Sequence, residues 1–276
     1  MMLRNGHNTR QLAIGNGFLP LPELYLSLLL FSGGALAHTE LIMNRQSLEN
    51  TVSIETTLFG PVQVQLKNSK TGQLLYEAIL DGPGKFEAQD LPPSSLNNLV
   101  LHAVPGKPAT ADPFIYRLPF SGNADWSISQ GFHGQASHDG ELNAYAVDFA
   151  IALGTPVISA RTGVVMEVID EYPDRGRARK SDLDQANVIR ILHEDGSMAV
   201  YGHLMQGSAT VTPGLWLVDG TVIAQSGNSG YSNGPHLHFA VQRNAGMRLE
   251  SIPFRMKSAN GLLGLEPDGP GSRGNP

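Results

Sequence analysis

Cysteine is absent from the 276-residue chain, and charged side chains make up only 16% of it. Without cysteine there is no disulfide scaffold, thiolate zinc site, iron–sulfur cluster or cysteine nucleophile. A metal ion would therefore have to be bound through histidine nitrogen and carboxylate oxygen atoms. Lys and Arg number 19 against 25 Asp and Glu, and this net charge of −6 lacks the basic footprint of a nucleic-acid-binding protein.

The chain also lacks a hydrophobic run that spans a bilayer comfortably, which takes about 20 apolar residues. Its hydrophobic run at residues 24–37 ends in Ala-Leu-Ala, a step typical of signal-peptidase cleavage, and follows Arg4 and Arg10. We expect residues 1–37 to be a signal peptide, with an uncleaved membrane anchor or a buried helix as the alternatives. The protein is thus predicted to be exported to the periplasm or the medium, with no further integral membrane domain.

Glycine and proline are abundant, at 31 and 18 residues, which favours short strands joined by turns over a helix bundle. Val62, Val64 and Leu66 alternate with glutamines, the period-two pattern of a half-buried strand, and residues 114–118 have a similar character. We therefore predict an all-β protein whose residues 38–119 form a small, β-sandwich-like accessory module. This module contains no constellation of catalytic residue types.

A second β-rich segment covers residues 120–256. Its β-branched or alternating stretches are 157–169, 186–204 and 235–241. From residue 257 to residue 276 the chain is rich in glycine and proline, and we predict that this tail is disordered.

Two histidines, His236 and His238, lie two positions apart in one of these predicted strands. Side chains two apart on a strand share a face, so both imidazoles point the same way. One can bind a metal ion while the other reaches the water beside it. On this spacing alone, a purely structural pair is at least as good an interpretation.

Asp148 lies between alanines on one face of a predicted strand whose other face is bulky and apolar. An unpaired buried carboxylate is costly, so Asp148 needs a cationic partner. A metal ion shared with His238 is one such partner, and an ion pair with Arg161 is the other. The spacing does not choose between them.

Two histidines and one carboxylate with an open fourth position are typical of a catalytic zinc site. The remaining ligand has to be His138 or His133, which precede Asp148 in a turn-like loop. His203 ends another predicted strand and is placed to face the same groove, although a lone histidine is more often structural. The His-Glu-x-x-His and Gly-x-Ser-x-Gly signatures of other hydrolases are absent from the sequence.

Several motifs then follow one another in a recognisable order. They are Gly-Thr-Pro-Val at 154–157, Tyr-Gly-His-Leu at 201–204, Ser-Gly-Asn-Ser-Gly at 226–230 and Gly-Pro-His-Leu-His-Phe at 234–239. Over residues 120–256 the chain resembles the lysostaphin-type (LytM-like) zinc endopeptidases. The resemblance implies a compact antiparallel β fold with an open groove, one zinc ion per chain, and cleavage of peptide cross-links in bacterial peptidoglycan.

The resemblance also implies residue roles. By position, Asp148 and His238 are zinc ligands, His236 is the general base on the zinc-bound water, and His203 steadies the developing oxyanion. A neutral imidazole is well matched to accept a proton from water at a zinc ion, because the metal lowers the pKa of that water to about 7.

One position departs from the common family pattern. The family places its first histidine four residues before the aspartate, where this chain has Ala144. A subset of the family takes that ligand from a Ser-His step, which here is Ser137-His138. We therefore favour His138 over His133 as the first zinc ligand.

Three functions follow from these features. The first is an exported zinc metalloendopeptidase that acts on peptidoglycan stem peptides and their cross-links. The second is a degenerate, non-catalytic member that binds peptidoglycan or activates a separate hydrolase, and the irregular first ligand is the feature that keeps it open. The third is a general secreted protease with the same mechanism and a different range of substrates.

Overall fold

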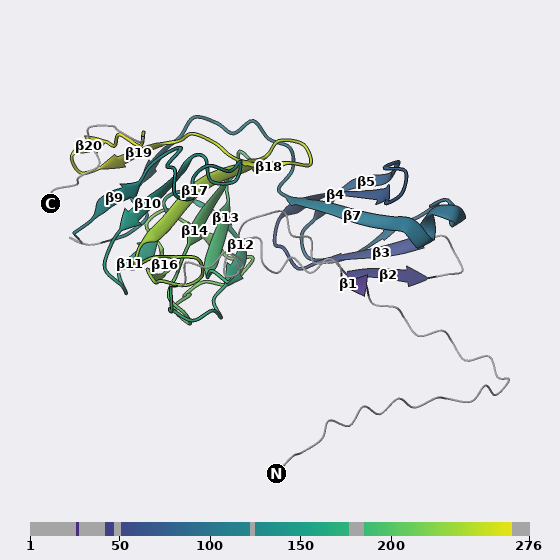
Figure 1. The fold of residues 1–276 in the computed structure, drawn as a ribbon, viewed down its shortest axis with the longest axis horizontal. Helices are drawn as coiled ribbons and strands as arrows, with labels where there is room; N and C mark the ends of the chain where they lie inside the picture. The colour runs from purple at the N-terminus through teal and green to yellow at the C-terminus, as the bar shows by residue number, and fades with distance from the viewer. Residues whose placement is uncertain (1–25, 28–41, 47–50, 122–124, 177–184, 267–276) are drawn as a thin grey trace, which may run out of the picture.

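The computed structural model describes residues 26–27, 42–46, 51–121, 125–176 and 185–266. In Figure 1 these residues form two lobes, with strands β1–β7 in one and β9–β18 in the other. The described residues contain one short helix, the 3-10 helix η1 (Pro93–Asn98), and none that is long and apolar enough to cross a membrane. The predicted all-β class is confirmed. Most of the predicted signal peptide, residues 1–25 and 28–37, lies outside the described part.

The N-terminal lobe consists of two antiparallel sheets. The four-stranded sheet has the order β1 (Leu26–Ser27), β2 (Ile42–Gln46), β3 (Thr51–Thr56) and β6 (Gly84–Ala88), and the three-stranded sheet has the order β5 (Leu74–Asp81), β4 (Pro61–Asn68) and β7 (Leu99–Pro105). The alternating residues Val62, Val64 and Leu66 fall in β4 and are fully buried, as the period-two pattern predicted. They pack against Val52 and Ile54 of β3 in one hydrophobic cluster.

The C-terminal lobe is built on one antiparallel sheet of eight strands. Its order is β15 (Trp216–Leu217), β12 (Gly163–Ile169), β13 (Val188–Leu192), β14 (Met198–Gly202), β17 (Leu237–Asn244), β10 (Ala146–Ala150) and β9 (Ser127–Gln130), with β18 (Leu249–Ser251) paired to β17. Two smaller sheets flank it, β11 (Pro156–Ile158) with β16 (Val222–Gln225), and β20 (Gly261–Leu262) with β19 (Arg255–Ser258) and β8 (Ile115–Arg117).

The two faces of the large sheet carry hydrophobic clusters of different size. Large residues on one face, such as Phe149, Tyr201 and Phe239, form the main hydrophobic core of this lobe. The other face carries a smaller hydrophobic cluster, in which Ala146 and Ala240 are neighbours on β10 and β17. Because side chains alternate along each strand, Asp148 and His238 fall on this second face, which leaves space above them.

The N-terminal lobe packs against one end of the same sheet. Met166 and Met198 of the C-terminal lobe lie inside the hydrophobic cluster of the N-terminal lobe. Asn244, at the end of β17, donates through Nδ2 to Gln63 Oε1 at 3.0 Å and to the carbonyl of Gly106 at 2.9 Å. The two lobes are therefore joined by both apolar packing and buried hydrogen bonds.

Two segments differ from their predicted assignments. Residues 114–118, assigned to the accessory module, contain β8, which pairs in parallel with β19 and sends Tyr116 into the core of the C-terminal lobe. The predicted disorder from residue 257 onward was wrong for residues 257–266, which include part of β19 and all of β20. Buried Leu265 holds this segment in place, since its carbonyl accepts a hydrogen bond from the Phe132 N–H at 2.8 Å. Residues 267–276 lie outside the described part.

Candidate metal centre

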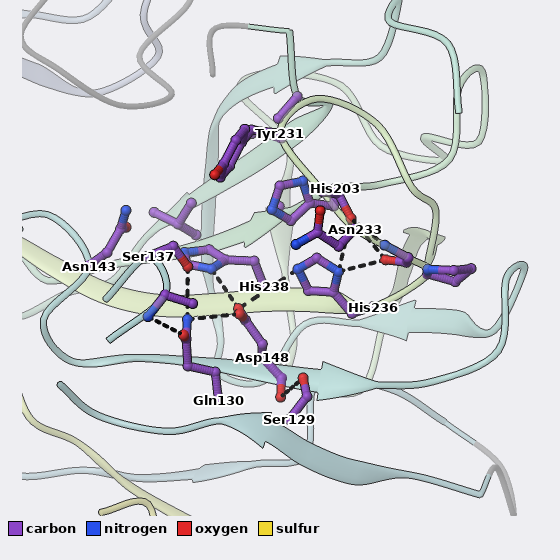
Figure 2. A pocket seen from close by; sticks show the side chains of 18 of the residues that line it. Ser129, Gln130, Ser137, Asn143, Asp148, His203, Tyr231, Asn233, His236 and His238 are labelled. Atoms are coloured by element: carbon purple, nitrogen blue, oxygen red, sulfur yellow. Dashed lines mark hydrogen bonds and ion pairs between the residues drawn. The ribbon is translucent and has the colours of Figure 1, made fainter. Parts of the chain in front are cut away.

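Three side chains predicted as metal ligands converge at one point. Asp148 of β10 and His238 of β17 are directly paired in register, and His138 approaches from the loop between β9 and β10. His238 Nδ1 lies 2.8 Å from Asp148 Oδ1, and His138 Nε2 lies 3.3 Å from the same oxygen. One ligand atom from each of the three lies within 4.8 Å of the others. Figure 2 shows the side chains of Asp148 and His238 pointing toward one another.

The orientation of His138 is set by the backbone of its own loop. Its Nδ1 donates to the carbonyl of Gly131 at 2.8 Å, and this hydrogen bond turns Nε2 toward Asp148. Metal-binding histidines commonly use a backbone carbonyl in this way to fix the tautomer. His138 is 0% exposed, so its ring has little freedom to move away.

Within the metal centre, the negative charge of Asp148 is stabilised by the neighbouring imidazoles of His138 and His238. Burial alone would raise the pKa of Asp148, but hydrogen bonds from His138 and His238 outweigh burial and bring that pKa well below its ordinary value. Burial likewise opposes protonation of His138, and contact with Asp148 outweighs it and raises the pKa of the imidazole. Two imidazole nitrogens and one carboxylate oxygen around a common point are a donor set suited to zinc.

Two further histidines stand at the edge of the metal centre. His236 donates through Nδ1 to the carbonyl of Gly234 at 2.8 Å, and its Nε2 lies 3.9 Å from Asp148 Oδ1. His203 donates through Nδ1 to the carbonyl of Ser229 at 2.7 Å, and its ring centroid is 4.5 Å from that of His236. Burial, reinforced by the neighbouring histidines, lowers the pKa of His203 to about 3, so its ring is neutral at neutral pH.

The backbone of His203 supports a special role for this residue. Its φ angle is 58°, in the left-handed region that residues other than glycine seldom adopt. Such strain persists where surrounding structure holds it, and it is common at functional sites.

The alternatives left open by the sequence lie elsewhere in the structure. His133 is exposed and packs its ring against Tyr145 at a centroid distance of 4.7 Å, outside the metal-binding group. Arg161 forms its ion pair with Asp195, at 2.9 Å, instead of with Asp148. Asp148 is thus paired with the histidines.

The pocket above the metal centre has a volume of about 440 Å³. His203, His236 and His238 line it together with Tyr231 and Asn233, which Figure 2 shows above the metal centre and near His203, respectively. The same pocket is also lined by Gln130, which contacts Asp148 directly and which the sequence did not single out. Its position follows from the register of β9 against β10, and no local motif marks it.

Comparison with known proteins finds similarity to peptidases in the part of the chain that carries Asp148, His203, His236 and His238. Residues 143–249 match the profile of Peptidase family M23. An uncharacterized metalloprotease of Haemophilus influenzae is 29% identical over 173 residues, which cover 60% of this chain and 34% of that protein. Lysostaphin of Staphylococcus simulans is 31% identical over 124 residues, covering 44% of this chain and 23% of lysostaphin. A peptidoglycan DD-endopeptidase of Vibrio cholerae is 31% identical over 122 residues, covering 43% of this chain and 25% of that enzyme.

These similarities concern only part of each relative. The chain spans between 23% and 34% of the length of the three proteins. The activities and substrates in their names therefore describe those proteins.

Proposed function

Residues 143–249 of this chain belong to Peptidase family M23, and from that membership and the geometry of the metal centre we propose an exported zinc metalloendopeptidase that hydrolyses peptide cross-links of bacterial peptidoglycan. The observation that carries the proposal is the convergence of His138, Asp148 and His238 beside His203 and His236 in one pocket. The peptidoglycan substrate is supported by similarity to the Vibrio cholerae endopeptidase. Export is supported only by the signal-like segment at residues 1–37.

Three residues would hold the zinc ion through His138 Nε2, Asp148 Oδ1 and His238 Nδ1. A zinc ion bound by three protein ligands supplies a Lewis acid that polarises a carbonyl group and acidifies water. These residues come from a loop and two paired strands, so most of the ligand geometry is fixed by the sheet before a metal ion arrives.

His236 has the geometry of a general base. Its Nδ1–H is committed to the carbonyl of Gly234, so the neutral ring has its lone pair on Nε2. That atom faces the metal centre, at 3.9 Å from Asp148 Oδ1. A proton removed from the attacking water can therefore be accepted at His236 Nε2.

His203 is held in a similar way and contributes differently. With Nδ1–H donated to Ser229, the neutral ring also presents Nε2 as an acceptor. It becomes a donor to an oxyanion only as an imidazolium ion, and burial disfavours that form until negative charge develops nearby. The oxyanion role proposed for His203 thus requires the imidazolium form of its ring.

The test of this function is hydrolysis of purified peptidoglycan by the full-length protein. We expect release of peptides with new amino termini, detected by mass spectrometry, and loss of release on adding a zinc chelator. The variant His236→Ala should lose at least about 100-fold in rate, because general-base catalysis contributes about 10²–10⁴-fold, and should keep its zinc. Intact peptidoglycan after incubation with the zinc-loaded wild type would favour the non-catalytic binding or activating function.

A further inference from the structure

Gln130 touches the metal centre without being one of its ligands. It is the last residue of β9 and pairs in register with Asp148. Its Nε2 donates to Asp148 Oδ2 at 3.2 Å and to Ser137 Oγ at 2.8 Å, while its Oε1 accepts from the N–H of Ala136 at 3.1 Å. Figure 2 shows the Gln130 side chain reaching toward both Asp148 and Ser137. Both N–H bonds of the amide are therefore used, one on each side of the metal centre.

The loop that Gln130 contacts is the one that delivers His138. Ala144, four residues before Asp148, lies in the turn that precedes β10 and offers no ligand atom, and the third ligand comes from the loop of residues 131–138. Within that loop, His138 is supported by its N–H bond to the Gly134 carbonyl, at 3.0 Å, and by its ring contact with Gly131. The contacts of Gln130 with Ala136 and Ser137 connect the loop to the sheet immediately before His138.

The two oxygens of Asp148 have different surroundings. Both histidine ligands approach Oδ1, at 2.8 and 3.3 Å, whereas Gln130 donates to Oδ2. The amide hydrogen bond occupies a lone pair of Oδ2, whereas the groups at Oδ1 are the two histidines that would share a metal ion with it. The hydrogen bond from Gln130 thus directs Oδ1 toward the cation.

We propose that Gln130 is a positioning residue of the metal centre: it fastens the His138 loop to β10 and reserves Asp148 Oδ1 for the zinc ion. This inference rests on the proposed metallopeptidase function. Gln130 acts through Asp148 and through the Ser137 step of the loop, and it contacts no reacting atom. Removing such a contact to a metal ligand typically weakens metal affinity about 10–100-fold.

The experiment measures zinc affinity of the full-length protein by competition with a chromophoric chelator. Gln130→Ala removes all three contacts, and Gln130→Glu keeps the shape of the side chain but removes its donor. The matched control is Ser129→Ala, because Ser129 Oγ donates only to the backbone carbonyl of Asp148, at 3.2 Å. We expect both Gln130 variants to bind zinc about 10–100-fold more weakly and the Ser129 variant to bind like the wild type.

Two further readouts separate positioning from a general structural role. The unfolding temperature of the zinc-free protein should fall only slightly in Gln130→Ala, because the three hydrogen bonds that are lost are part-buried or exposed, and by too little to account for the loss of zinc affinity. With Co²⁺ in place of zinc, the visible absorption spectrum should change in Gln130→Ala and not in Ser129→Ala, because Asp148 Oδ2 becomes free to bind the ion.

Wild-type affinity and an unchanged Co²⁺ spectrum in Gln130→Ala would overturn the proposal. So would a zinc-free protein destabilised enough to account for the whole loss of affinity. If the Gln130 variants do not fold, Ser137→Ala removes one contact of the same side chain and should weaken zinc binding several-fold. Absence of peptidoglycan hydrolysis by a wild type that shows this affinity pattern would reject the proposed function and leave the role of Gln130 intact.

Discussion

Asp148 and His238 face each other across neighbouring antiparallel strands, with Asp148 Oδ1 and His238 Nδ1 2.8 Å apart. The pairing of β10 with β17 places both side chains on the face of the sheet that carries the smaller hydrophobic cluster. Their separation is therefore a property of the sheet register, and only His138 depends on a loop. The loop that carries His138 is therefore the part of the metal centre in which a substitution should change zinc affinity most.

Glycine 134 offers a test of the loop. A Cβ atom at this position would overlap the side chain of Gln130, whereas a Cβ at Gly140 in the same connection meets nothing within 4 Å. We expect Gly134→Ala to displace Gln130 and to weaken zinc affinity about as much as Gln130→Ala, by about 10–100-fold. Gly140→Ala is the matched control and should bind zinc like the wild type. Equal zinc affinities for the two glycine variants, measured by chelator competition, would show that Gln130 and the loop adapt without cost.

The buried side chain of His193 should make the free energy of unfolding depend on pH. Burial, with help from nearby Arg161, lowers the pKa of His193 to about 4, against 6.5 for a free imidazole. The unfolded chain therefore binds this proton more readily, so the contribution is fully present above pH 6.5 and is lost as the pH falls toward 4. The gap between the two pKa values corresponds to about 3 kcal/mol.

The measurement is the free energy of unfolding by urea at several pH values between 7 and 4. The variant His193→Phe should lose this part of the pH dependence, and exposed His133→Gln should keep it. Parallel pH profiles for wild type and His193→Phe would contradict the assignment.

The ion pair between Arg190 and Glu167 is buried on the sheet next to the pocket. Arg190 is 1% exposed, and its Nε lies 3.4 Å from Glu167 Oε2 while its Nη1 donates to Gln242 Oε1 at 2.8 Å. Removing one partner of a buried ion pair costs about 3–5 kcal/mol, so Arg190→Met should lower the free energy of unfolding by that amount.

The control for Arg190 is an exposed ion pair. Arg248 pairs with Glu141 at 3.1 Å and with Glu250 at 2.7 Å, and its own side chain is 55% exposed. Ion pairs at the surface contribute about 0–1 kcal/mol, and Glu250 keeps its ion pair with Arg243 when Arg248 is replaced. Arg248→Met should therefore unfold nearly like the wild type in urea. Comparable losses in the two variants would show that the buried Arg190 pair stabilises the fold no more than an exposed pair does.

A substitution of Asn244 can test whether the two lobes unfold together. Its side chain is fully buried and donates to both Gln63 and Gly106 of the N-terminal half. Replacing it with alanine takes this donor from the Gly106 carbonyl, and an unsatisfied buried group costs about 1–3 kcal/mol. Gln63 Oε1 keeps its hydrogen bond from the Met247 N–H at 2.9 Å. In Asn244→Ala we expect a lower unfolding temperature with a single transition, followed by calorimetry. A separate, earlier transition for the N-terminal lobe would mean that the lobes are only loosely coupled.

The sequence predicts the strand-borne parts of the fold and site well, because a strand imposes a simple period of two. That period placed Asp148 on the same face as its alanine neighbours, and it buried Val62, Val64 and Leu66 in β4. The motif order indicated the peptidase family, which the match to Peptidase family M23 at residues 143–249 confirms.

Long-range pairing is what the sequence could not supply. Nothing local indicates that β8 joins β19 more than 130 residues away, or that Gln130 faces Asp148 across β9 and β10. The glycine and proline content predicted disorder at residues 257–266, and this prediction was wrong because buried apolar residues such as Leu265 hold the segment in place. The orientation of His138 likewise depends on the Gly131 carbonyl, which only the folded loop presents.

The most direct test of the metal centre is elemental analysis of zinc in the full-length wild type, His138→Ala and His133→Ala. The account predicts one zinc ion per chain in the wild type and in His133→Ala, because His133 lies outside the group, and loss of zinc in His138→Ala. Zinc retained by a folded His138→Ala variant, or absent from a folded wild type prepared without chelators, would contradict a centre made by His138, Asp148 and His238.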